Sequence, residues 1–129
     1  MIKVILAYVV ASVAVAHNIL DYGAVVDEIT HDAEVANSNA IKAAIQAANS
    51  DDNDDRLVEI PAHTFSTLPI RNENINNITM QIDGTILASK DWKSYTTTVD
   101  LILGTQIDHV LSFYDSCNLL FTGSGVIDG

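Results

Sequence analysis

Met80-Gln81-Ile82-Asp83-Gly84-Thr85-Ile86-Leu87-Ala88 is the stretch that decides the fold of this chain. It joins two short runs of strand-forming residues through Asp83-Gly84, which predicts two strands with a sharp corner between them. Residues 120–129 repeat this outline, again with a glycine-marked corner inside an apolar run. Repetition of one unit favours a fold of stacked coils, although Asp83-Gly84 also suits the tight turn of a hairpin in an antiparallel sandwich.

Similar short runs of strand-forming residues lie on both sides of this stretch. From Leu57 onward the sequence consists of short runs rich in Ile, Val, Leu and Thr, bounded by Gly, Asn, Asp or Pro. Such runs predict short strands, and their number indicates an all-β fold. The strands predicted in this way are residues 57–60, 78–82, 85–88, 99–103, 110–114, 119–122 and 126–127.

One helix precedes the strands. Between Ser38 and Asn49, apolar residues recur with helical spacing, which predicts a helix with a single apolar stripe. Ser38 or Asn37 could cap its start. The residues of the stripe are Ile41, Ala44, Ile45 and Ala48.

The first sixteen residues have the features of a signal peptide. Lys3 is followed by an uncharged stretch at residues 4–16, which is too short for a spanning helix of roughly 20 residues. Ala14-Val15-Ala16 fits the small-x-small cleavage pattern, so we expect cleavage between Ala16 and His17. The sequence therefore predicts a secreted, extracellular protein whose mature domain begins at His17.

Charge and cysteine content restrict the classes of partner. The chain has 17 Asp and Glu against 6 Lys and Arg, a formal net charge of −11. This charge argues against nucleic acid and anionic membrane surfaces as partners. Cys117 is the single cysteine, so no internal disulfide can form, and its apolar context predicts a small buried residue.

Few residues stand out as candidates for chemistry. The 4 histidines have no His, Cys or Glu partner at metal-ligand spacing, which predicts ordinary surface or turn residues. The acidic run at residues 51–55 lacks the Gly and Glu of a calcium loop, because Arg56 and Ala62 stand there instead, and it is interpreted as a solvated loop. Asn77-Ile78-Thr79 is an N-glycosylation sequon, either used on an exposed corner, as the neighbouring Asn76 suggests, or unused on an inward-facing strand.

Five phrases carry a resemblance to a known family. They resemble, in order, the opening phrases of polygalacturonases, glycoside hydrolase family 28 of the pectin-lyase-like proteins. His63 stands where that family usually has glycine. The matching phrases are residues 18–24, 39–45, 58–65, 80–89 and 120–129.

The resemblance implies the first coils of a right-handed, single-stranded parallel β-helix with an N-terminal capping helix. It implies inverting hydrolysis of α-1,4-galacturonan, a pectic polysaccharide of the cell wall, without a metal or other cofactor. A general acid would protonate the leaving oxygen while opposing carboxylates activate water. The family's Asn-Thr-Asp, Gly-Asp-Asp, Gly-His-Gly and Arg-Ile-Lys motifs are absent here. The catalytic residues are therefore expected beyond Gly129, and residues 17–129 alone are expected to be inactive.

Two other interpretations remain open from the sequence. Several β-helix families share the first two phrases, so the chain could belong to a glucanase or a pectin lyase-like enzyme. A β-helix without catalytic activity, used for carbohydrate binding, would also carry these phrases.

Overall fold

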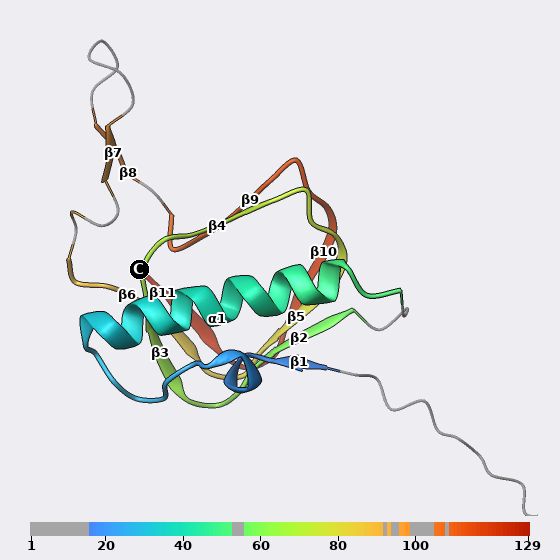
Figure 1. The fold of residues 1–129 in the computed structure, drawn as a ribbon, viewed down its shortest axis with the longest axis horizontal. Helices are drawn as coiled ribbons and strands as arrows, with labels where there is room; N and C mark the ends of the chain where they lie inside the picture. Colours follow the sequence, from blue (N-terminus) through green and yellow to red (C-terminus); the bar gives the residue numbers. More distant parts are fainter. Residues whose placement is uncertain (1–15, 53–55, 92, 94–95, 99–104, 108) are drawn as a thin grey trace, which may run out of the picture.

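The computed structural model describes residues 16–52, 56–91, 93, 96–98, 105–107 and 109–129 (Figure 1). The predicted strand at residues 99–103 lies outside the described residues. In chain order the elements are β1 (His17–Asn18), the short 3₁₀ helix η1 (Ile19–Tyr22), α1 (His31–Asn49), β2 (Leu57–Ile60), β3 (Thr64–Thr67), β4 (Ile70–Glu73), β5 (Asn76–Ile82), β6 (Thr85–Ala88), β7 (Thr96–Thr98), β8 (Thr105–Ile107), β9 (Leu111–Tyr114), β10 (Cys117–Thr122) and β11 (Val126–Asp128).

The strands pair in parallel, with β7–β8 as the one antiparallel pair among those described. One sheet has the order β1-β2-β5-β10, a second has the order β11-β6-β3, and β4 pairs with β9. Strands that follow one another in the chain, such as β5 and β6, therefore lie in different sheets. Asp83-Gly84 turns a corner between two sheets and does not close a hairpin, so the antiparallel-sandwich alternative is wrong.

The strand register shows that two segments of the chain occupy equivalent positions in the stack of strands. Ile70 pairs with Leu111, Asn76 with Cys117 and Thr85 with Val126, a constant separation of 41 residues. Residues 70–88 and 111–128 therefore stack as two successive layers. The repeat predicted between residues 80–88 and 120–129 is confirmed as a pair of stacked corners.

Close approach of the layers explains the corner glycines. A Cβ atom on Gly84 would overlap the carbonyl oxygens of Pro61 and His63 in the layer below. A Cβ atom on Gly125 would in turn overlap the carbonyl oxygen of Gly84. A side chain at either position would hold the layers apart, so the stacking distance itself requires glycine. His63 does not have a positive φ, so a non-glycine residue is tolerated there.

The polar residues of two strands explain why these strands were not predicted from the sequence. The predictions for residues 57–60 and 85–88 coincide with β2 and β6. β3 and β4 were missed because they carry Thr, Ser, Arg, Asn and Glu in place of an apolar run. Burial alternates along β4, so Ile70 and Asn72 face inward while Arg71 and Glu73 face solvent.

The helix α1 begins at His31, about two turns before the predicted start at Ser38. Thr30 is its N-cap, and the Thr30 hydroxyl accepts a hydrogen bond of 3.2 Å from the backbone N–H of Ala33. The predicted caps Asn37 and Ser38 instead lie inside the helix. The end at Asn49 is as predicted.

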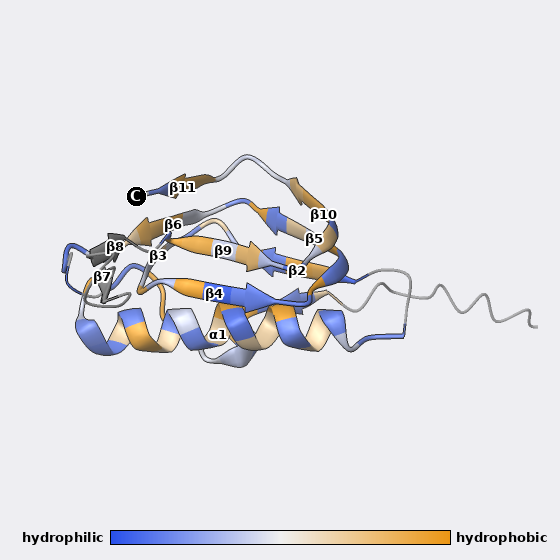
Figure 2. Ribbon diagram, turned by 90° about the horizontal axis from the view of Figure 1, so that it is seen from above, coloured by the Kyte–Doolittle hydropathy of each residue, from blue (hydrophilic) through white to orange (hydrophobic). Residues whose placement is uncertain are grey.

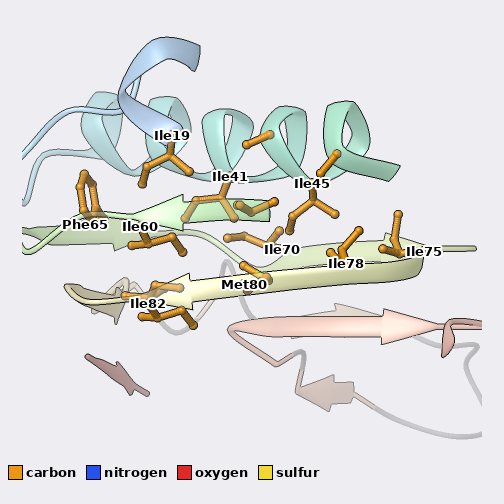
Figure 3. Close-up of a cluster of buried hydrophobic side chains, with 14 residues drawn as sticks. Ile19, Ile41, Ile45, Ile60, Phe65, Ile70, Ile75, Ile78, Met80 and Ile82 are labelled. Atoms are coloured by element: carbon orange, nitrogen blue, oxygen red, sulfur yellow. The ribbon is translucent and has the colours of Figure 1, made fainter. Parts of the chain in front are cut away.

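The predicted apolar stripe of α1 is fully buried against the strands (Figure 3). Ile41 and Ile45 point toward Ile60, Ile70 and Ile78. Each fully buried isoleucine contributes roughly 1.5–3 kcal/mol relative to exposure, so this contact is a major source of the stability of the fold.

Figure 2 shows α1 along one side of the strands, with β10 and β11 on the opposite side. The helix therefore covers one end of the stack of layers, and the last layer forms the other end.

Candidate functional site

The end of the stack beside α1 is closed by polar groups, beginning with Asp27. The backbone N–H of Asp27 donates to the carbonyl of Thr64 at 2.9 Å, and its Oδ1 accepts from the Thr64 N–H at 2.9 Å. Asp27 thereby replaces a neighbouring strand on the outer edge of β3. Its φ of +56° is one that Asp adopts more readily than most residues. The Thr64 N–H, together with His63 beside it, lowers the pKa of the Asp27 carboxyl below its ordinary 3.8.

Side chains of α1 continue this closure along the same edge. Asn37 donates from Nδ2 to the Ser66 carbonyl at 2.9 Å, and its Oδ1 accepts from the Val25 N–H at 2.7 Å. The Ser38 hydroxyl accepts from the Leu68 N–H at 2.8 Å. The sequence suggested that Asn37 and Ser38 would cap the helix, but they cap the sheet.

Asn49, the last residue of α1, closes the corner before β5. Its Oδ1 accepts from the Asn76 N–H at 2.9 Å, and its Nδ2 donates to the Asn74 carbonyl at 3.2 Å. Arg56 holds this end of the helix by donating hydrogen bonds to the carbonyls of Ala48 and Asn49. Because buried or half-buried backbone groups need partners, these bonds explain why the helix sits in one position on the strands.

The opposite end of the described stack is formed by β10 and β11. No strand among the described residues pairs with the outer edge of β10 or β11. Leu120, Phe121, Val126 and Ile127 are 59%, 47%, 55% and 45% exposed. Phe113 and Phe121 meet edge to face, with ring centroids 5.8 Å apart, beside a hollow of about 460 Å³. In the part of the chain that the structure describes, this end combines exposed apolar side chains with strand edges that no other strand pairs.

His17, predicted as the first residue of the mature protein, lies at the start of β1. Its Nδ1 lies 2.7 Å from the Tyr22 hydroxyl, and its Nε2 lies 3.0 Å from Oδ2 of Asp51. The side chain is 13% exposed, so the expectation of an ordinary surface histidine is wrong for His17. Asp51 likewise contacts His17 and is not a freely solvated loop residue, while residues 53–55 of the acidic run lie outside the described residues.

The remaining histidines that are described agree better with the sequence. His31 and His109 are exposed, and His63 is half exposed beside Asp27, with Nδ1 3.4 Å from Oδ2. No group of three or more His, Cys, Asp or Glu residues in the described part of the chain could hold a metal ion.

Asn77, the candidate glycosylation site, is exposed at the start of β5 and has a φ of +55°. Its Oδ1 accepts a hydrogen bond of 2.8 Å from Nδ2 of Asn118 in the next layer. The amide nitrogen that a glycan would occupy is not used in this bond.

Cys117 is exposed, and the prediction that it is buried is wrong. It begins β10, and among the described residues no strand lies beyond β10 in that sheet. Its Sγ lies 3.0 Å from Oδ1 of Asn76 in the layer below.

Comparison with protein-family models, curated proteins and solved structures gave no match. The family resemblance therefore rests on the five sequence phrases. In the part of the chain that the structure describes, no helix has the length and apolar character needed to cross a membrane.

Proposed function

We propose that this chain forms the first coils of a right-handed parallel β-helix in a secreted hydrolase of the polygalacturonase type, acting on pectic polysaccharide. The observation that carries the proposal is the stacking of the two phrases at residues 80–89 and 120–129. Thr85 pairs with Val126 and Ile86 with Ile127, and the glycine corners lie one above the other. A parallel β-helix requires this arrangement of repeated corners.

The closed end supports the same proposal. A terminal coil of a stacked fold needs a polar cap, and Asp27, Asn37, Ser38 and Asn49 supply one. Two of the resembling phrases, residues 18–24 and 39–45, belong to the segments that make or adjoin this cap. The capping role of the helix is therefore consistent with its place in the proposed family.

In this proposal the described residues act as a scaffold and not as the catalytic centre. Inverting hydrolysis needs carboxyl groups on both sides of the glycosidic bond, and the motifs that supply them are absent from the sequence. Galacturonan is itself a polyanion, and a chain with a net charge of −11 does not attract it by charge. Substrate binding and catalysis would both fall to coils that follow Gly129.

Reading the transcript beyond codon 129 tests the proposal. We expect Asn-Thr-Asp followed by Gly-His-Gly, and we expect the encoded longer protein to release reducing ends from polygalacturonate. The 129-residue chain should release none. Further coils without these motifs would instead support a glucanase, a lyase or a carbohydrate-binding β-helix, and activity of the 129-residue chain itself would contradict the proposal.

Secretion is tested separately. Material expressed through a eukaryotic secretion host should begin at His17 when its N-terminus is sequenced. Membrane-bound material that retains Met1 would contradict this part of the proposal.

A further inference from the structure

We propose that Tyr22, His17 and Asp51 form a relay of nucleophile, base and carboxylate that makes the Tyr22 hydroxyl reactive toward activated acyl donors such as aryl esters. The three residues lie in β1, in η1 and directly after α1. The inference rests on the contacts of His17 and not on the proposed hydrolase function, whose catalytic residues are expected beyond Gly129.

His17 contacts its two partners through different ring nitrogens. Its Nδ1 lies 2.7 Å from the Tyr22 hydroxyl, and its Nε2 lies 3.0 Å from Oδ2 of Asp51. A hydroxyl within hydrogen-bond reach of a base that a third group orients is the usual arrangement of an activated nucleophile. An ionised carboxylate only accepts hydrogen bonds, so in the neutral ring the proton lies on the Nε2 that faces Asp51. Nδ1 is then unprotonated and accepts the hydrogen bond of the Tyr22 hydroxyl.

The fold holds the three residues in place before any acyl donor arrives. His17 belongs to β1, which pairs with β2. Tyr22 ends η1, which is anchored by the fully buried Ile19. The Asp51 N–H donates to the carbonyl of Ala48 at 3.2 Å, at the end of α1. A nucleophile held beside its base in advance reacts without the entropic cost of bringing the two together.

Exposure differs along the relay in the way that such a reaction requires. Tyr22 is 37% exposed, so a reagent from solvent can reach it. The side chains of His17 and Asp51 are only 13% and 20% exposed. Partial burial strengthens the attraction between the carboxylate and an imidazolium relative to water, and it keeps solvent from competing for both groups.

The proposed step is an acyl transfer. The Tyr22 oxygen attacks the carbonyl carbon of the ester while Nδ1 of His17 takes the hydroxyl proton. A bond forms between the Tyr22 oxygen and the carbonyl carbon, the bond from this carbon to the aryl oxygen breaks, and the aryloxide leaves with the electron pair. Asp51 is a positioning residue, because it orients the ring and stabilises the imidazolium. His17 then returns its proton to water, and acyl-Tyr22 is the product.

The test is acetylation of the secreted 129-residue chain by p-nitrophenyl acetate at neutral pH, followed by mass spectrometry of its peptides. Tyr114 is the matched control within the same molecule, because it is 38% exposed and its ring contacts Arg71. We expect Tyr22 to be acetylated at least about tenfold faster than Tyr114, since a positioned base contributes this much or more. Hydroxylamine should remove the acetyl group from Tyr22, because it cleaves aryl esters and leaves acetylated amines intact.

Variants separate this relay from a purely structural contact. His17→Gln keeps an amide in place of the ring but supplies no base, and it should slow acetylation of Tyr22 to the rate of Tyr114. Asp51→Asn should slow the reaction several-fold, and Asp51→Glu should restore part of the rate because it returns the carboxylate. Thermal unfolding followed by circular dichroism identifies the variants that fold like the parent chain.

Equal rates at Tyr22 and Tyr114 in the parent chain would overturn the proposal and would mean that His17 only fastens β1 to the end of α1. A fast reaction at Tyr22 that persists in a folded His17→Gln chain would overturn it as well. The comparison of the two tyrosines in the parent chain needs no variant, so it decides the question even if a variant does not fold. The presence or absence of activity on polygalacturonate does not affect this result.

Discussion

Asn118 lies beside Asn77, although 41 residues separate them in the chain, and the Nδ2 of Asn118 donates a 2.8 Å hydrogen bond to the Oδ1 of Asn77. Both residues have φ near +55°. Asparagine tolerates this left-handed conformation better than most residues, and its amide can link to the next asparagine in the stack. Asparagine therefore both adopts the left-handed backbone conformation and links the two layers at this repeated corner.

Substitutions of Asn118 should separate the contribution of the hydrogen bond to stability from that of the backbone conformation. Asn118→Ala loses the hydrogen bond and places an alanine at positive φ, so we expect a loss of about 1–2 kcal/mol in the free energy of unfolding. Asn118→Gly loses the bond but keeps a residue suited to the backbone conformation, and it should cost less. Urea denaturation of the parent chain and the two variants gives the free energy of unfolding of each, and so both contributions. Equal losses in the two variants would show that the backbone conformation contributes nothing.

We expect a glycan on Asn77 when the chain is secreted from a eukaryotic host. Asn77 is exposed, and its hydrogen bond to Asn118 uses Oδ1, which leaves Nδ2 for the sugar. Mass spectrometry should show added hexose and N-acetylhexosamine that Asn77→Gln removes. Thr79→Ala keeps Asn77 but destroys the sequon, and it should remove the same mass. An unmodified mass in the parent chain would contradict the prediction.

Gly84→Ala should be severely destabilising, because its new Cβ would overlap the carbonyl oxygens of Pro61 and His63. Backbone atoms cannot move aside as a flexible side chain can, so we expect a loss of at least about 3 kcal/mol. Gly23→Ala is the control, since Gly23 has φ of +94° but open space around it. It should cost only about 1 kcal/mol for the backbone conformation. Thermal unfolding followed by circular dichroism compares the two, and similar losses would contradict the close-stacking argument.

The Asp27 carboxylate should make stability depend on pH in the acid range. Its pKa is lowered in the folded protein, chiefly by the Thr64 N–H, so the charged form is favoured by folding. This contribution is present above the unfolded pKa, near 3.8, and is lost as the pH falls through the lower folded value. Asp27→Asn keeps an oxygen acceptor and removes the charge.

Melting temperatures of the two proteins between pH 2 and 7 measure this contribution. The parent chain should be the more stable at pH 7, and the difference should vanish at the acid end. Asp21→Asn removes one charge from the same end of the molecule and serves as the control. A difference between parent and Asp27→Asn that is constant across the whole pH range would contradict the assignment.

The sequence by itself determined the local elements. The apolar stripe of α1, the strands β2 and β6 and the glycine corner at Gly84 follow from periodicity, residue type and the need for close approach. Each of these signals is contained in a few neighbouring residues. The repeat at residues 120–129 could also be recognised, because stacked layers place the same demands on equivalent corners.

Only the tertiary structure decided the roles of individual polar side chains. Asn37 and Ser38 look like helix caps in the sequence, yet they bond to β3 and the residue that follows it. His17 meets Asp51 across 34 residues, and Cys117 is exposed on β10, beyond which no described strand lies in that sheet. The physical reason is the same in each case: a polar group takes the partner that folding brings to it, and parallel layers bring together residues that are distant in sequence.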